Sequence, residues 1–208
     1  VDLHRTVLLA DDYLLDIYDY QAEAEHTADY VYHNIGEHGP LLQTTPLDGP
    51  LGEGAGYQHI TDVSTADVGD TWQTDFEVPE TGRVRLTMLG EPATQVFLGT
   101  GMTGRDTAPC PAVIARRRTA DTTWVSTIEW RRPAAEFAIT GIERLPVEAD
   151  GEALALRIER TDGHDLLILA PGVAGEKRAG DLTTEAQLAF LSVRGGEVTG
   201  MERVDQVE

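Results

Sequence analysis

Side chains suited to acid–base chemistry gather in one short stretch, HTADYVYHNIG, at residues 26–36. Imidazole and phenol groups can transfer protons, and imidazole also binds metal ions. His33 and Tyr32 are therefore candidates for catalysis, and Asn34 and His38, at the start of a loop, are candidates for substrate binding. The alternative interpretation is that all four are hydrogen-bonded polar groups at the edge of a sheet.

A metal site at the histidines is not expected. His26 and His33 lie seven residues apart, so a continuous strand directs their side chains to opposite faces. The sequence also lacks the HxH and HExxH spacings of zinc sites. Its single cysteine, Cys110, excludes an internal disulfide and a cysteine-based zinc site. The residues therefore predict no metal ion and no other cofactor in this chain.

Two further side chains are candidates for binding a glycan. The indole of Trp72 could stack on a sugar ring, and the guanidinium of Arg117 could hold a carboxylate by two parallel hydrogen bonds. Alternation along a strand would direct Arg117 away from the face of Arg116 and Arg118. The alternative for such arginines, including Arg131, is pairing with the many acidic residues of the chain.

The chain has 208 residues, and its 16 basic and 36 acidic side chains give a formal net charge of −20. Such a surface repels nucleic acids and anionic membranes, and no segment approaches the roughly 20 apolar residues of a membrane helix. The start, VDLHRTVLLADD, lacks the basic end and apolar run of a signal peptide. We expect a solvated acidic surface with neither nucleic acid nor membrane as partner. The residues assign no cellular compartment.

Apolar and polar residues alternate over most of the sequence, as is typical of strands with one buried and one exposed face. Trp72, Thr74, Phe76 and Val78 show the pattern, and PETG marks the turn that follows. The sequence predicts an all-β protein, a large antiparallel β-sandwich of roughly 12–14 strands, in a single domain over residues 1–208. Strands are expected near residues 4–10, 13–20, 27–34, 57–63, 72–78, 83–89, 94–98, 112–117, 122–130, 138–146, 153–160, 165–170, 186–194 and 197–204.

Several segments have a more specific expectation. QAEAE, at residues 21–25, is expected to be a turn between two antiparallel strands, and this hairpin would gather four tyrosines on one face. The Gly- and Pro-rich residues 36–56 and 99–111 are predicted as loops, of the long kind that often carry binding functions. Trp124 and Trp130 have the same parity as Ile128, so both are expected to be buried. The tyrosines concerned are Tyr18, Tyr20, Tyr30 and Tyr32.

Residues 4–39, HRTVLLADDYLLDIYDYQAEAEHTADYVYHNIGEHG, resemble a segment of the heparinase II/III-like and oligoalginate lyase families. In those families an arginine-bearing strand leads to an aspartate-containing strand, a histidine, an aromatic–acidic strand and an H-x-x-G motif. The runs WQTDFEVPETGRVRLTMLGEP, PAVIARRRTADTTWVSTIEW and DLLILAPG also resemble later strands of the families' β-sandwich. Six residues match the first motif in order: Arg5, Asp16, His26, Tyr30, His33 and Gly36.

The resemblance implies a polysaccharide lyase, which removes the C5 proton of a uronate and expels the 4-linked sugar by β-elimination. These families combine an N-terminal α/α toroid, which carries most catalytic groups, with a large β-sandwich whose first segment contains zinc ligands in an H-x-H pattern. We expect this sequence to start after both features, so zinc is implied only for the full-length family member. The resemblance thus implies the C-terminal portion of a lyase. Its substrate would be an acidic polysaccharide or oligosaccharide, and its partner an upstream α/α toroid domain or chain. The alternative is a stand-alone carbohydrate-binding or docking β-domain.

Overall fold

Strands dominate the computed structural model, which describes residues 1–54, 56–102 and 108–207. Within these residues the only helical element is the short 3₁₀-helix η1 (Tyr57–His59), and all sheets are antiparallel, which confirms the predicted fold class. The chain divides into two compact units, Val1–Phe137 and Ala138–Glu208, each with its own sheet and apolar core. The interpretation of residues 1–208 as a single domain stays a prediction.

The first unit contains a nine-stranded sheet. The hydrogen-bonded order is β3-β6-β7-β9-β8-β5-β4, and β2 pairs with both β1 and β9. The strands are β1 (Asp2–Leu9), β2 (Tyr13–His33), β3 (Glu37–His38), β4 (Thr45–Pro46), β5 (Thr61–Val68), β6 (Trp72–Val78), β7 (Gly82–Met88), β8 (Thr94–Met102) and β9 (Pro109–Arg131). Of the loop predicted at 99–111, both ends belong to strands, and residues 103–107 lie outside the described residues.

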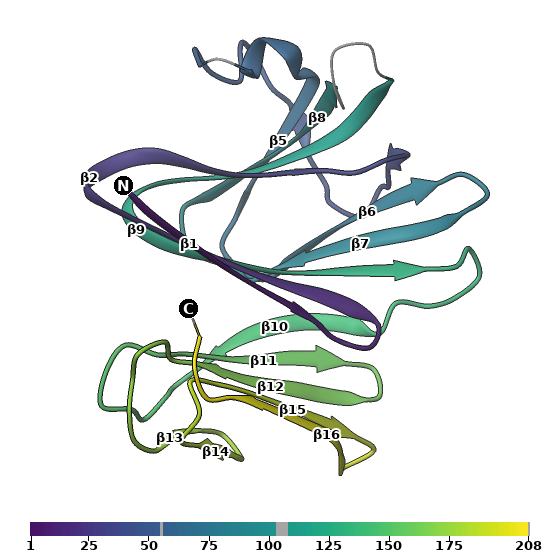
Figure 1. The fold of residues 1–208 in the computed structure, drawn as a ribbon. Coiled ribbons are helices and arrows are strands. Elements are labelled where there is room, and N and C mark those ends of the chain that lie inside the picture. Colours follow the sequence, from purple (N-terminus) through teal and green to yellow (C-terminus); the bar gives the residue numbers. More distant parts are fainter. Residues whose placement is uncertain (55, 103–107, 208) are drawn as a thin grey trace. The chain divides into compact units, whose positions relative to one another are not determined.

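Two long strands, β2 and β9, fold this sheet into two layers (Figure 1). One part of β9 pairs with β7 and an earlier part pairs with β8, while β2 accompanies β9 along both parts. The β2–β9 register shifts between Gln21 and His26, where a bulge allows the strands to bend. The predicted turn at residues 21–25 and its hairpin are therefore wrong, because QAEAE is an exposed part of one continuous strand.

The core of the first unit lies between the two layers and is rich in aromatic rings. Four tyrosines of β2 belong to it, with Tyr20 and Tyr30 buried and Tyr18 and Tyr32 packed against the buried cluster. Trp124 of β9 lies among them, with its ring centroid 6.1 Å from that of Tyr18 and 6.4 Å from that of Tyr30. The predicted common face of the tyrosines is confirmed, although a single bent strand provides it.

The two tryptophans of β9 differ in their burial. Trp124 is 1% exposed, as expected, whereas Trp130 is 48% exposed, so its predicted burial is wrong. Both have the same parity on β9, but Trp130 pairs with Val84 close to the end of the strand. Its indole nitrogen lies beside Gly82, which has no side chain to cover the ring. Parity predicts the face of a side chain, but not how far the covering layer extends.

The second unit contains a five-stranded sheet and a two-stranded sheet. Its core consists of leucines, alanines and Ile168. Lys177, the only lysine, is fully buried, and its Nζ donates to the carbonyl oxygens of Val173 and Glu185 at 2.7 and 2.9 Å. The larger sheet has the order β10 (Ile139–Leu145), β11 (Leu154–Arg160), β12 (Gly163–Leu169), β15 (Leu188–Arg194) and β16 (Glu197–Val204), and the smaller pairs β13 (Lys177–Ala179) with β14 (Leu182–Thr184).

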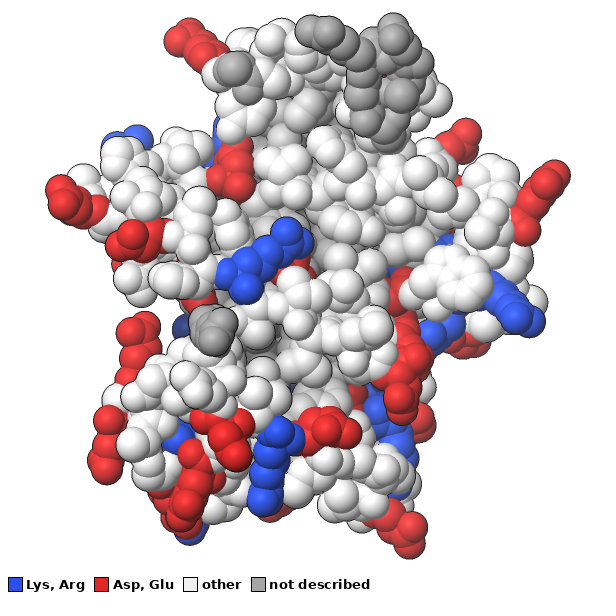
Figure 2. Space-filling view, in the orientation of Figure 1, with Lys and Arg blue, Asp and Glu red and all other residues white. Residues whose placement is uncertain are grey.

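Carboxylates are spread over the face shown in Figure 2, with isolated basic groups among them. Several arginines pair with carboxylates, as the alternative interpretation predicted. These pairs join Arg116 to Asp29, Arg118 to Glu25, and Arg131 to both Asp12 and Glu129. The described residues contain no helix with the length and apolarity of a membrane span.

Candidate functional site

The long loop predicted at residues 36–56 forms one wall of a cavity in the first unit. Gly36, whose φ is 92°, turns the chain after β2, and a Cβ there would lie 2.1 Å from a carbonyl oxygen of β6. This turn places β3 beside β6, where His38 pairs with Phe76. Further along the loop, β4 pairs with β5. The loop is therefore attached to the sheet at two places.

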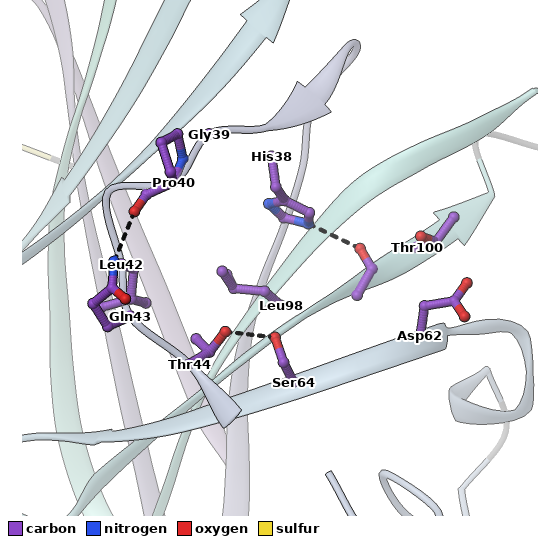
Figure 3. Close-up of a pocket in the computed structure, with 11 residues that line it drawn as sticks. His38, Gly39, Pro40, Leu42, Gln43, Thr44, Asp62, Ser64, Leu98 and Thr100 are labelled. Carbon is purple, nitrogen blue, oxygen red and sulfur yellow. Dashed lines mark hydrogen bonds between the residues drawn. The ribbon is translucent and has the colours of Figure 1, made fainter. Parts of the chain in front are cut away.

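The cavity, which we name the His38 cavity, has a volume of about 350 Å³, within the range of small-molecule sites. Figure 3 shows His38 and Thr100 on one side, Thr44 and Ser64 on the other, and Leu98 between them. The Thr44 hydroxyl donates to the Ser64 hydroxyl at 2.8 Å. The cavity is defined mainly by His38, Thr44, Asp62, Ser64, Leu98 and Thr100.

His38 is uncharged in this cavity at neutral pH. Its Nε2 lies 3.0 Å from the carbonyl oxygen of Gly99, and because a carbonyl only accepts, Nε2 carries the proton. Nδ1 is then unprotonated, and it is buried without a hydrogen-bond partner among the described residues. Burial lowers the pKa of His38, and the bond to Gly99 opposes that shift. Protonation would leave an unsatisfied N–H in the interior, so the imidazole supplies no positive charge.

Asp62 brings a carboxylate to the cavity from a left-handed backbone position. Its φ is 52°, in the left-handed region, where the β5–β8 register shifts between Thr61 and Ser64. Aspartate is one of the few non-glycine residues that adopt this conformation readily. The exposed carboxylate accepts a hydrogen bond of 3.1 Å from the Thr61 hydroxyl. Figure 3 shows it on the side of the cavity where Thr100 lies.

Gly99 allows strand β8 to approach this irregular part of β5. A Cβ on Gly99 would lie 2.8 Å from Cγ2 of Ile60 and 3.1 Å from the carbonyl oxygen of Thr61. The carbonyl of the same glycine accepts the hydrogen bond from His38. Gly99 thus contacts both the irregular part of β5 and His38 of the loop wall.

Two further cavities adjoin the His38 cavity. One, of about 310 Å³, shares His38 and Thr100 and is also lined by Cys110. The other, of about 470 Å³, shares Asp62 and lies beside Tyr57. Burial raises the pKa of the Cys110 thiol, which opposes formation of a reactive thiolate. His38 and Asp62 therefore lie where neighbouring cavities meet.

Arg116 fastens Leu51 and Tyr57 to the sheet. Its Nε and Nη2 donate to the two carboxylate oxygens of Asp29 at 2.8 Å each, and Nη1 donates to the Leu51 carbonyl at 2.8 Å. The guanidinium lies over the ring of Tyr57, whose hydroxyl also donates to Asp29. The charge of Arg116 is therefore neutralised by Asp29, and the loop wall of the 470 Å³ cavity is held in place.

The predicted catalytic and binding residues near the loop differ in their surroundings. His33 is exposed, and its Nε2 lies 3.1 Å from where a Cβ on Gly101 would be. The Asn34 backbone donates to the Pro111 carbonyl at 3.1 Å, and its side-chain Nδ2 is buried without a partner among the described residues. Of the three residues His33, Asn34 and His38, only His38 lines the His38 cavity itself.

Tyr32 does not have the properties of a base at neutral pH. Its ring packs against Phe76, with 5.6 Å between ring centroids. Burial raises the pKa of Tyr32 to about 12. The phenol therefore stays protonated, and its described contacts are those of a core residue.

Trp72 and Arg117, the predicted glycan-binding residues, both lie inside the first unit. Trp72 is 5% exposed and belongs to the core, so neither face of its ring is available to a sugar. Arg117 is 4% exposed, and its guanidinium donates to the hydroxyls of Thr94 and Thr122 and lies over Trp124. As parity predicted, Arg116 and Arg117 point to opposite faces, but neither is at the His38 cavity.

Arg5, Asp16 and Tyr30 form a cluster that also includes Ser126. Arg5 donates from Nε and Nη2 to the two carboxylate oxygens of Asp16, at 2.8 and 2.9 Å. The Tyr30 hydroxyl donates to Asp16 Oδ2 at 2.9 Å and lies 3.1 Å from the Ser126 hydroxyl. Burial, more than any other cause, raises the pKa of Tyr30. The cluster thus joins β1, both parts of β2 and β9 around a fully buried carboxylate.

Metal binding has no evident ligand set in the described part of the chain, where no three His, Cys, Asp or Glu side chains converge. The sequence matches no protein-family model, and it shows no significant similarity to a curated protein.

Sequence reasoning did not single out Thr44, Asp62, Ser64 or Thr100 as site residues. Thr44 lies in a loop that was predicted to carry binding function, so its position was open to inference. No sequence pattern marked Asp62 as a site residue. Its place at the cavity results from a bulge and a left-handed backbone, and both depend on the pairing of β5 with β8. Ser64 and Thr100 follow ordinary strand patterns, and only the paired strands bring them to one cavity.

Proposed function

We propose that this chain is the β-sandwich portion of a polysaccharide lyase that cleaves uronate-containing glycans by β-elimination. The observation that carries the proposal is the cluster of Arg5, Asp16 and Tyr30. They are three of the six residues that match the motif of the heparinase II/III-like families in order. In this structure the three side chains meet in one hydrogen-bonded group. Their spacing along the chain does not by itself require contact, so their convergence supports a shared fold.

The proposal assigns the chemical step to a helical domain outside this sequence. In β-elimination a base takes the C5 proton, a C4=C5 double bond forms, the C4–O bond breaks, and the oxygen of the released sugar takes up a proton. The step needs a base and a group that stabilises the enolate-like charge. Burial raises the pKa of both Tyr30 and Tyr32, which does not favour either as the base. Zinc would belong to the H-x-H segment of the full-length enzyme, and the sandwich would hold the glycan.

The test compares this chain with a longer polypeptide that includes its upstream sequence. Both are mixed with a panel of acidic oligosaccharides, and ultraviolet absorbance of the unsaturated uronate product is followed. We expect product from the longer polypeptide and none from residues 1–208 alone. If the longer polypeptide forms no unsaturated product with any uronate glycan, the proposal is wrong.

A docking role is the second candidate, and one observation favours it. Leu3, Val7 and Leu9 occupy one face of β1 and are 52%, 52% and 82% exposed. Apolar side chains aligned on an outer strand are typical of a surface that another domain covers. Hydrogen exchange of residues 2–9 should slow when the upstream polypeptide is added, and unchanged exchange would argue against docking at β1.

A further inference from the structure

The His38 cavity contains several groups that can bind hydroxyls. The Thr44 hydroxyl donates a hydrogen bond to the Ser64 hydroxyl, so the Ser64 O–H can in turn donate a hydrogen bond to a ligand. Thr100 adds a third hydroxyl, and the apolar side chain of Leu98 lies between these groups. Hydroxyls beside an apolar surface suit a sugar, which has polar edges and C–H faces.

The charge of the cavity favours a neutral ligand. Asp62 contributes a carboxylate, His38 is uncharged, and the described residues that line the cavity include no lysine or arginine. A uronate carboxylate would meet Asp62 without a positive charge from these residues to offset the repulsion. A sugar hydroxyl would instead donate to Asp62 in a charge-assisted hydrogen bond, which is roughly twice as strong as a neutral one.

The backbone of Asp62 adds a second, independent observation. The left-handed φ of 52° and the register shift place this carboxylate at the cavity. Bulges often re-aim a side chain beside a binding site. The bulge thus brings an acidic side chain to the place where two cavities adjoin, within reach of a ligand in either one.

We propose that the His38 cavity is a subsite for an uncharged sugar residue, whose hydroxyls bond to Asp62, Thr44, Ser64 and Thr100. This inference rests on the proposed function, because it assigns one part of the glycan to one part of the sandwich. The uronate that undergoes elimination would lie outside this cavity, and a neutral neighbour in the same glycan would occupy it.

The experiment is isothermal titration calorimetry of the chain with neutral disaccharides of glucose, galactose and mannose. Each titration is repeated with the corresponding sugar oxidised at C6 to a uronate. The key variant is Asp62→Asn, because asparagine also tolerates the left-handed backbone and keeps the shape of the side chain. Asp67→Asn, which changes another exposed carboxylate on β5, is the matched control. Ser64→Ala tests the cavity without altering the residue at the bulge.

We expect at least one neutral disaccharide to bind more tightly than its oxidised counterpart. Asp62→Asn should weaken that binding by about tenfold, which corresponds to about 1.4 kcal/mol, and Ser64→Ala should weaken it to a smaller extent. Asp67→Asn should leave it unchanged. The inference is overturned if no neutral disaccharide binds, if uronates bind equally well, or if Asp62→Asn has no more effect than Asp67→Asn.

These outcomes are separate from those of the lyase assay. Neutral-sugar binding by the chain, with no elimination by the longer polypeptide, would support the subsite and remove the lyase proposal. Elimination by the longer polypeptide, with no binding of neutral sugars at the His38 cavity, would remove the subsite and keep the lyase proposal.

Discussion

Arg5 and Asp16 contribute unequally to their ion pair, because the Arg5 side chain is 58% exposed and that of Asp16 is fully buried. Removing Arg5 leaves a buried carboxylate with only neutral partners in the cluster. Removing Asp16 leaves an arginine that water can still reach. The cost of breaking the pair therefore depends on which residue is changed, and Arg5 is the more informative choice.

Arg5→Met should destabilise the first unit by about 3 kcal/mol, because it leaves the Asp16 charge unpaired in the interior. Arg118→Met is the matched control, since Arg118 and Glu25 are 76% and 67% exposed and their contacting atoms are 3.6 Å apart. Such surface pairs contribute about 0–1 kcal/mol. Urea unfolding followed by tryptophan fluorescence reports this unit, because Trp72, Trp124 and Trp130 all lie in it. Equal losses for the two variants would contradict the buried-charge argument.

The lowered pKa of His38 predicts a dependence of stability on pH. The unfolded chain binds a proton at this imidazole near pH 6.5, while the folded cavity resists protonation, so acid favours unfolding. The contribution of His38 is complete above about pH 6.5 and decreases as the pH falls below that value.

Comparing wild type with His38→Gln isolates this effect. The stability of the wild type relative to the variant should decrease as the pH is lowered from about 7.5 to about 5 in urea unfolding measurements. His59→Gln, which removes an exposed imidazole outside the His38 cavity, is the control. A difference between wild type and His38→Gln that is constant over this range would show that the His38 environment does not shift its titration.

At the scale of elements, the close approach of β8 and β5 depends on the missing side chain of Gly99. Gly99→Ala should destabilise the first unit by about 1–3 kcal/mol, because the new methyl group meets Ile60 and the Thr61 carbonyl. Gly69→Ala is the control, because a Cβ at Gly69 would meet no atom within 4 Å. Fluorescence-detected urea unfolding measures both variants. A loss for Gly69→Ala as large as that for Gly99→Ala would show that strand spacing is not responsible.

Many strands followed from sequence patterns, and the failures have a common physical cause. The predictions at residues 72–78 and 197–204 match β6 and β16. In contrast, β2 and β9 were each divided in two, at polar segments near residues 21–25 and 118–121. Where the sheet bends, none of the residues 21–25 and 118–121 is fully buried, so local composition resembles that of a turn. Only the pairing of two strands far apart in sequence distinguishes the two cases.

The candidate site was predictable to a smaller extent than the fold. The sequence predicted that His38 lies in a loop of the kind that often carries binding functions, but its bond to Gly99 requires the folded sheet. Trp72 and Arg117 were chosen for their chemistry, which many core residues share, and both are buried. Asp62 was recognised as a candidate site residue only from its backbone conformation and its position in the cavity lining. Residue type alone thus does not distinguish a ligand contact from a structural role.

For the whole molecule, a net charge of −20 implies repulsion among surface carboxylates. Sodium chloride should raise the urea midpoint of the first unit between about 0.01 and 0.5 M, because screening over this range shortens the Debye length from about 30 Å to below 8 Å. The midpoint is measured by tryptophan fluorescence at fixed pH, in buffers that contain no glycerol. A midpoint that falls with salt would show that ion pairs such as that of Arg116 and Asp29 outweigh the repulsion.

The pairing of β2 with β9 also affects folding during synthesis, because β2 is made before its partner strand. Tyr18 pairs with Trp124, and 124 − 18 = 106 positions separate them. A ribosome therefore releases β2 well before its partner exists, and the tyrosines of β2 stay open to other contacts during that interval. Because so many of its contacts span long sequence distances, we expect the chain to refold over milliseconds to seconds.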